Sequence, residues 1–258
     1  MLSKATKKDM LTHSSEPLFE NHLAFMRGHR GELCQVNGGL QLQSAMAGVS
    51  WWMPVAQDAL IPPGCDCVRL AASSGGQWPD RLTRLGFRCV EELSYMELVD
   101  GLLRHMHSVF DVEIVTVADD ASADDFASVQ TAAFFEDELD EVVEPWRQCF
   151  HAMARANYNR ADQQFLLGRI EGQPSACMLA VRTPPVSGLY AVGTDPRWRR
   201  RGLSTALLAR AVADAKCAGA SRVILQAVKG SYVEGFYCRL GFVTCFESTV
   251  WRLPRVES

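Results

Sequence analysis

Four arginines stand close together in the segment TDPRWRRRGLSTALLARAV, residues 194–212, and this segment has the composition of an anion site. They are Arg197, Arg199, Arg200 and Arg201, followed at once by Gly202 and an apolar stretch with the spacing of a helix. The first N–H groups of a helix have no intrahelical acceptor, and together they carry about half a positive charge. Gly202 leaves that backbone open to an anion because it has no side chain. The segment is therefore either a solvated basic corner or a site for a pyrophosphate.

The spacing narrows the kinds of phosphate site that fit. From Arg199 the pattern is R-x-x-G-x-S, where Ser204 is small and adds a hydroxyl donor. It lacks the early glycines of a dinucleotide-binding G-x-G-x-x-G and the Gly-Lys-Ser/Thr of a Walker A loop. Taken alone, the pattern fits a solvated helix start as well as it fits an anion site.

Two motifs in this order resemble the GNAT acetyltransferase superfamily. Arg199, Gly202 and Ser204 occupy the positions of that family's Q/R-x-x-G-x-G/A motif, from which Ser204 departs mildly. The segment FYCRLGF, residues 236–242, is similar to the family's Tyr-x-x-Leu-Gly-Phe helix end, with the tyrosine at Tyr237. The resemblance covers residues 109–258 directly.

The resemblance implies acyl transfer from acetyl-CoA to a primary amine by direct attack in a ternary complex. It implies that a splayed strand binds the pantetheine amide of the cofactor through its backbone, and that the following helix start binds the pyrophosphate. The cofactor-binding residues implied are Val192, Gly193, Thr194, Arg199, Arg200, Arg201, Gly202, Leu203, Ser204, Thr205 and Ser231. Ser231 follows Gly230, where the family often has Asn, and it either replaces that pantetheine contact or only caps a helix.

The resemblance also implies an acid and a base. Tyr237 is the implied general acid, and the alternative is a tyrosine that only packs its ring beneath the sheet. Glu136, within the acidic run FFEDELDE (134–141), and Glu234, three residues before Tyr237, are candidates for the general base. A chain of water molecules fits equally well, and for the acidic run so does a solvated capping loop.

Three functions remain open at this point. The leading one is a GNAT-type N-acetyltransferase that acts on a small cationic amine, because the acidic run would attract such an acceptor. The second is a non-catalytic acyl-CoA sensor, and the third is an acyltransferase that uses a longer acyl-CoA. No metal is expected, since His105 and His107 have no third ligand nearby.

Composition excludes some partners. The 258 residues carry a net charge of −4, which argues against a general nucleic-acid binder, and no apolar run has the length of a membrane helix. The nine scattered cysteines favour a cytoplasmic protein with reduced thiols, each a small buried hydrophobe. Oligomeric state is not readable, and a homodimer stays open.

The elements that must position these residues predict an α/β fold, a central mixed sheet flanked by helices. Strands are expected at 112–118, 163–172, 173–183, 187–195, 222–228 and 242–253. Helices are expected at 124–135 with acidic capping residues, 141–156, 202–218 and 231–241. Strand-like runs also occur at 32–36, 40–46, 49–55 and 67–73.

An internal repeat predicts two tandem folds of this kind. Residues 70–87 align with residues 225–242 without a gap at a constant offset of 155, and both segments end in RLGF. The first copy has Leu82 in place of Tyr237 and lacks an R-x-x-G-x-G/A motif. We therefore expect a degenerate GNAT-like domain at 1–108 and a catalytic domain at 109–258. The aromatic segment SWWMPV, residues 50–55, is expected in the core of the first.

Overall fold

The computed structural model describes residues 16–46, 48–56, 58–71, 74, 76–99, 103 and 112–254. The chain divides into two compact units. Unit 1 comprises Met1–Ala24, Glu97–Leu225 and Tyr237–Val243, and unit 2 comprises Phe25–Met96, Gln226–Phe236 and Thr244–Ser258. The expected boundary at 108/109 and the histidines at 105 and 107 lie outside the described residues, so that boundary stays a prediction.

Unit 1 is built on a mixed sheet. Strands β6 (Glu113–Thr116), β7 (Gln163–Ile170), β8 (Gln173–Thr183) and β9 (Val186–Thr194) form an antiparallel series, and β10 (Arg222–Val228) pairs in parallel with β9. The middle of β8 is buried over seven consecutive residues, which means that both faces of the sheet are covered. These strands match the expected ranges, although β6 is shorter than predicted.

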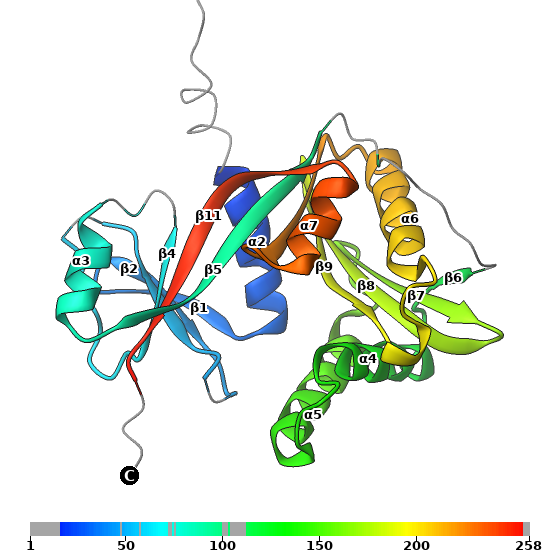
Figure 1. The fold of residues 1–258 in the computed structure, drawn as a ribbon, viewed down its shortest axis with the longest axis horizontal. Helices are drawn as coiled ribbons and strands as arrows, with labels where there is room; N and C mark the ends of the chain where they lie inside the picture. Colours follow the sequence, from blue (N-terminus) through cyan, green and yellow to red (C-terminus); the bar gives the residue numbers. More distant parts are fainter. Residues whose placement is uncertain are drawn as a thin grey trace, which may run out of the picture. The chain divides into compact units, whose positions relative to one another are not determined.

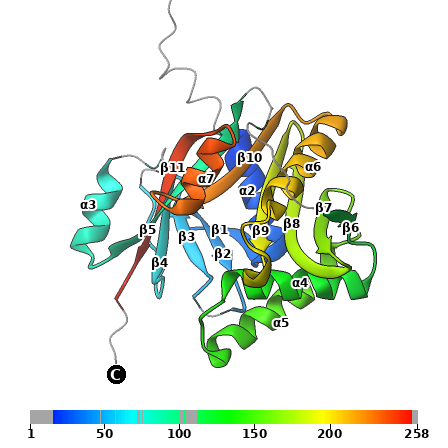
Figure 2. The ribbon, with the colours of Figure 1, turned by 45° about the vertical axis from the view of Figure 1, so that its right-hand side comes forward.

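Helices cover both faces of this sheet. Helix α4 (Asp120–Phe134) and helix α6 (Leu203–Cys217) both pack against β7, β8 and β9. Figures 1 and 2 show α4 and α5 (Asp140–Asn157) on one side of these strands and α6 on the other. Helix α6 ends at Cys217, one residue before the expected end, and is followed by Gly219, whose φ of 83° is in the left-handed region.

The expected start of α4 is wrong by four residues. The helix begins after Asp119, whose side chain accepts a hydrogen bond from the Ser122 N–H, while the Ser122 hydroxyl bonds back to the Asp119 N–H. This capping box therefore sets the start of the helix, and the acidic residues at 124 and 125, where the start was expected, do not. Asp124 lies inside the helix and binds Arg155 and His151 of α5, and the hydrogen bond from Arg155 is the main reason that the pKa of Asp124 is lowered.

A helix that the sequence did not predict contributes its residues up to Ala24 to unit 1. This is α2 (Glu16–His29), and the side chain of its Asn21 is fully buried. The Asn21 amide donates to the Val181 carbonyl at 2.9 Å and to the Thr183 hydroxyl at 2.8 Å, and it accepts from the Tyr190 hydroxyl at 2.7 Å. Residues from the start of the chain therefore fasten β8 to β9 in the unit that contains the candidate site.

Unit 2 contains further strands and one helix. Its strand order is β1 (Glu32–Val36), β2 (Gly39–Gln43), β3 (Trp51–Pro54), β4 (Cys67–Ala71), β11 (Phe242–Arg252) and β5 (Arg88–Leu98). Helix α3 (Gln77–Arg84) buries Trp78 and Leu82 against Trp52, Val68 and Leu70. Trp51 and Trp52 are both buried, which confirms the core position of SWWMPV.

The elements confirm the internal repeat. In the first copy β4, α3 and β5 follow one another, and in the second β10, α7 (Tyr232–Arg239) and β11 do so. At the offset of 155, α3 maps onto α7 from its first residue to its last. Leu82, which stands in the place of Tyr237, is fully buried in the apolar core of unit 2.

The nine cysteines are all free, as expected, but most of them are not buried. Cys67 and Cys177 are buried, whereas Cys89, Cys217 and Cys238 are exposed, so the expectation of nine small buried hydrophobes is wrong. None of the helices within the described ranges is both long enough and apolar enough to cross a membrane.

Candidate functional site

The end of β9 carries a bulge at the predicted pantetheine-binding residues. Leu179 of β8 pairs with Tyr190 and Cys177 pairs with Gly193, so Ala191 and Val192 together face one residue of β8. Ala191 has a φ of 49°, which is unusual for a residue with a side chain. The bulge interrupts the ladder at Ala191 and Val192, and the pairing with β8 resumes at Gly193 and Thr194.

The predicted splay between β9 and β10 is also present. Among the described residues, their parallel pairing joins only Val186–Gly188 to Arg222–Ile224. The rest of β9 pairs with β8 on its other edge. The backbone of Val192, Gly193 and Thr194 therefore has one edge on which an extended ligand can bind as an added strand.

Gly193 is pressed against the end of α4. A Cβ atom at this position would lie 2.8 Å from the Cβ of Ala133 and 3.3 Å from the sulfur of Cys177. Cys177 is fully buried, and that burial raises the pKa of its thiol, which donates to the Ala191 carbonyl at 3.4 Å. Glycine is therefore required here by close packing of helix on strand.

Gly193→Ala is expected to lower the free energy of unfolding by about 1–3 kcal/mol, because the new methyl group overpacks the contact with Ala133. Chemical denaturation measures this loss. Gly168→Ala in β7 is the matched control, since its nearest neighbour would lie 3.5 Å away, an ordinary contact. Equal stability of the two variants would contradict the assigned contact.

The predicted phosphate site lies where β9 leads into α6. Gly202 has a φ of 78° and precedes the helix, which has no side-chain cap. The Ala206 N–H donates to the Gly202 carbonyl and so begins the hydrogen bonding of the helix. The N–H groups of the first turn that precede it have no acceptor within the helix. The hydroxyls of Thr194 and Ser204 lie 2.8 Å apart, which ties the end of β9 to the start of α6.

The four arginines of this segment have different partners. Arg197 is locked by a bidentate pair with Asp195, which also accepts from the Arg197 N–H, and these hydrogen bonds lower the pKa of Asp195. The Arg201 guanidinium lies 4.9 Å from the ring centre of Trp198. Arg199 and Arg200 differ from these two and from each other.

Arg199 binds the acidic run, although its side chain is half-exposed. Its guanidinium forms an ion pair with Glu136 and a long hydrogen bond of 3.4 Å to the Ala133 carbonyl. Within the described part of the chain, Arg200 has neither an ion pair nor a hydrogen bond. The sequence missed Asp195 and Ala133 as parts of this site, although an Asp before Pro is a common signal for a helix cap.

Tyr237 lies in α7 and is buried, with 5% of its surface exposed. Its ring centre lies 5.9 Å from that of Phe242, and burial raises the pKa of its hydroxyl above the ordinary value. The phenol is therefore protonated at neutral pH, as a proton donor must be.

Ser231 and Glu234 belong to unit 2, and both take part in capping α7. The Ser231 hydroxyl accepts from the Glu234 N–H at 3.1 Å, and the Glu234 carboxylate accepts from the Gly230 N–H at 2.6 Å. The other Glu234 oxygen accepts from the Ser94 hydroxyl at 2.5 Å, and this bond is the main cause of the lowered pKa of Glu234. These contacts favour the capping alternative for Ser231 and disfavour Glu234 as a base.

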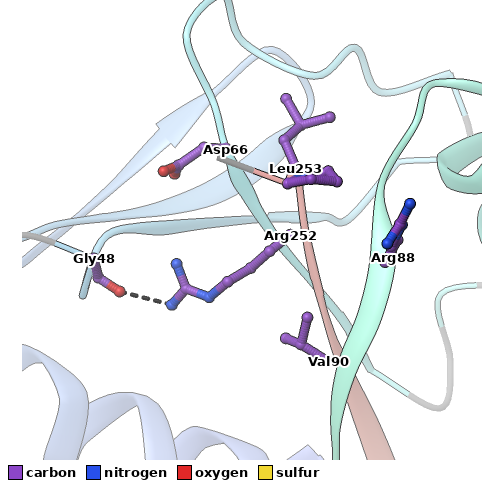
Figure 3. A pocket seen from close by; sticks show the side chains of 7 residues that line it. Gly48, Asp66, Arg88, Val90, Arg252 and Leu253 are labelled. Carbon is purple, nitrogen blue, oxygen red and sulfur yellow. Dashed lines mark hydrogen bonds between the residues drawn. The ribbon is translucent and has the colours of Figure 1, made fainter. Parts of the chain in front are cut away.

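An open pocket of about 530 Å³ lies elsewhere, in unit 2. Figure 3 shows the Arg252 guanidinium donating to the Gly48 carbonyl, with Asp66, Arg88 and Val90 nearby. Its lining includes none of the residues predicted for the site. In the described ranges, no group of three or more His, Cys, Asp or Glu side chains is arranged to hold a metal ion.

Comparison with known proteins gives these features a family. A family model described as "Acetyltransferase (GNAT) family" matches residues 127–242. No curated protein was found to match the chain.

Solved structures share the fold at low sequence identity. A GCN5-related N-acetyltransferase from Kribbella flavida has a TM-score of 0.64 at 15% identity, over 98% of each chain. A conserved protein of unknown function from Staphylococcus epidermidis ATCC 12228 has the same TM-score and identity, over 88% of this chain and 96% of its own. A tandem GNAT protein from the clavulanic acid biosynthesis pathway has a TM-score of 0.51 at 11% identity, over 85% and 80% of the two chains.

Three features therefore occur together in a chain that resembles known proteins: the bulged strand, the uncapped helix start after Gly202 and the repeated strand–helix–strand unit. Residues 127–242 match the acetyltransferase (GNAT) family, and the chain as a whole shares its fold with solved GNAT proteins, one of them a tandem GNAT protein.

Proposed function

We propose that this protein is an N-acetyltransferase that moves an acetyl group from acetyl-CoA to the primary amine of a small cationic acceptor. The observation that carries the proposal is the junction of β9 and α6. There a glycine with a φ of 78° opens an uncapped helix start directly after a bulged strand that is unpaired on one edge. The match of residues 127–242 to the GNAT family supports acyl transfer as the reaction class.

In this proposal the backbone does most of the cofactor binding. The N–H groups at the start of α6, with Arg200, bind the pyrophosphate, because they are uncapped and carry the positive end of the helix dipole. The free edge of residues 192–194 bonds the pantetheine arm, and one N–H there faces the thioester oxygen as negative charge develops on it. Residues 109–258 would form the catalytic part.

Two side-chain roles complete the proposal. Tyr237 donates a proton to the departing thiolate, and its buried phenol is protonated for that purpose. The acidic run of Glu136, Asp137, Glu138 and Asp140 attracts the ammonium form of the acceptor. Since Glu136 is paired with Arg199 and Glu234 caps α7, water is the best-supported carrier of the amine proton.

Release of free thiol from acetyl-CoA tests the proposal directly. The purified protein is expected to turn over with at least one amine from a panel of polyamines, amino acids, aminoglycosides and peptides. Binding of coenzyme A without turnover across this panel would favour an acyl-CoA sensor. Faster turnover with a longer acyl-CoA than with acetyl-CoA would favour the third function. No binding of coenzyme A would remove the proposal altogether.

A further inference from the structure

The end of α4 lacks a cation of its own. No basic residue stands in its last turn, and its final intrahelical bond runs from the Phe135 N–H to the Thr131 carbonyl. The following carbonyls, including that of Ala133, carry the negative end of the helix dipole and have no acceptor role inside the helix. Arg199, which follows β9 in the chain, donates to the Ala133 carbonyl and supplies the missing positive charge.

The loop after α4 depends on the same side chain. Glu136 forms an ion pair with Arg199. Among the described residues outside α4 and α5, Arg199 is the one polar partner of residues 136–138. Helix α5 begins after Leu139 without a side-chain cap, and Leu139 is 67% exposed. The acidic run therefore has one polar cross-link to the phosphate-binding segment, and Arg199 provides it.

The cross-link lies next to the bulge of β9, because Ala133 contacts both Arg199 and Gly193. The Cβ of Ala133 packs on Gly193 in the bulge of β9, and its carbonyl binds Arg199. Both terminal nitrogens of the Arg199 guanidinium are engaged, Nη1 by Glu136 and Nη2 by the Ala133 carbonyl. Arg200, in contrast, has no such partner among the described residues.

We propose that Arg199 is a positioning residue for the acceptor side and not a phosphate ligand. It clasps Ala133 and Glu136, and it thereby holds the acidic run of residues 136–140 beside the bulge where the thioester is expected. This inference rests on the proposed function for its catalytic meaning, but the clasp itself can be tested without turnover.

Hydrogen exchange tests the clasp in the full chain. Arg199→Ala and Glu136→Ala are each expected to speed amide exchange at residues 136–139 by about two- to fivefold, as befits a half-exposed ion pair. The double variant is expected to show no further increase, because both changes break one contact. Arg160→Ala, which removes an exposed ion pair with Asp162 in the same unit, is the matched control and should leave these amides unchanged.

Coenzyme A affinity separates the clasp from a phosphate contact. Arg199→Ala is expected to leave the Kd for coenzyme A within about twofold, whereas Arg200→Ala should weaken it about tenfold, the size of one charge-assisted hydrogen bond. In turnover with the fastest amine of the panel, Arg199→Ala should raise the KM for the amine and not that for acetyl-CoA. Arg199→Lys should restore part of the amine KM, since one charge remains.

Two results would overturn the inference. One is unchanged exchange at residues 136–139 in Arg199→Ala. The other is a loss of coenzyme A affinity in Arg199→Ala as large as that in Arg200→Ala. If wild-type protein fails to bind coenzyme A or to turn over, the proposed function fails, while the exchange experiment still decides whether the clasp exists.

Discussion

Gly202→Glu is expected to abolish coenzyme A binding. A glutamate here would place a carboxylate at the uncapped start of α6, where it would take the N–H groups that the pyrophosphate needs. Loss of two charge-assisted hydrogen bonds costs about 3 kcal/mol or more, which is roughly a 100-fold or greater rise in Kd. Titration calorimetry with coenzyme A measures this change.

The opposite end of the same helix offers the control. Gly219 has a φ of 83°, close to the 78° of Gly202, and a side chain added there would meet nothing within 4 Å. Gly219→Glu therefore introduces the same left-handed strain, about 1–2 kcal/mol, without touching the anion site. An unchanged Kd in Gly202→Glu would remove the assignment of the α6 start as the pyrophosphate site, and equal loss in both variants would point to misfolding.

Much of the fold of residues 109–258 was predictable because its signals are local. Helix α6 runs between Gly202 and Gly219, and the apolar run at 222–228 is a buried strand, as its composition indicates. The offset of 155 predicted α3 and β5 from α7 and β11. The predictions for α6 and β10 use residues that lie close together in the sequence, where turn chemistry and periodicity decide the structure.

What could not be predicted depends on contacts between distant segments. The amide of Asn21 bonds residues about 160 positions away, and nothing in its neighbourhood along the chain marks it as buried. Ala191 adopts a positive φ without being glycine or asparagine, so the bulge of β9 has no local signal.

The arginine cluster shows the same limit within the site. Its composition indicated an anion site, but the division of labour among the arginines depends on Asp195, Glu136 and Trp198. Arg197 and Arg201 are engaged by near neighbours, and Arg199 by a residue 63 positions away. Residue type thus predicted the charge of the site and not which side chain faces the ligand.

Tyr237→Phe is expected to lower kcat roughly tenfold to a thousandfold while leaving the Kd for coenzyme A unchanged. The ring keeps its packing near Phe242, and only the hydroxyl is lost. A thiol has a pKa of about 8.5 and an ordinary tyrosine one of about 10, so the proton transfer is uphill, and burial raises the Tyr237 pKa further. The phenol therefore contributes only as charge builds on the sulfur, which is why its removal affects kcat and not binding.

The raised pKa also sets the pH dependence. Because burial favours the neutral phenol, Tyr237 should stay protonated past pH about 10, and wild-type kcat should show no alkaline fall below that pH from this group. Tyr95→Phe is the matched control: Tyr95 is equally buried, stacks on Phe246 in unit 2 and also has a raised pKa. If Tyr237→Phe keeps more than half of the wild-type kcat, or Tyr95→Phe loses as much, the phenol of Tyr237 is not the acid, and water must protonate the leaving thiolate.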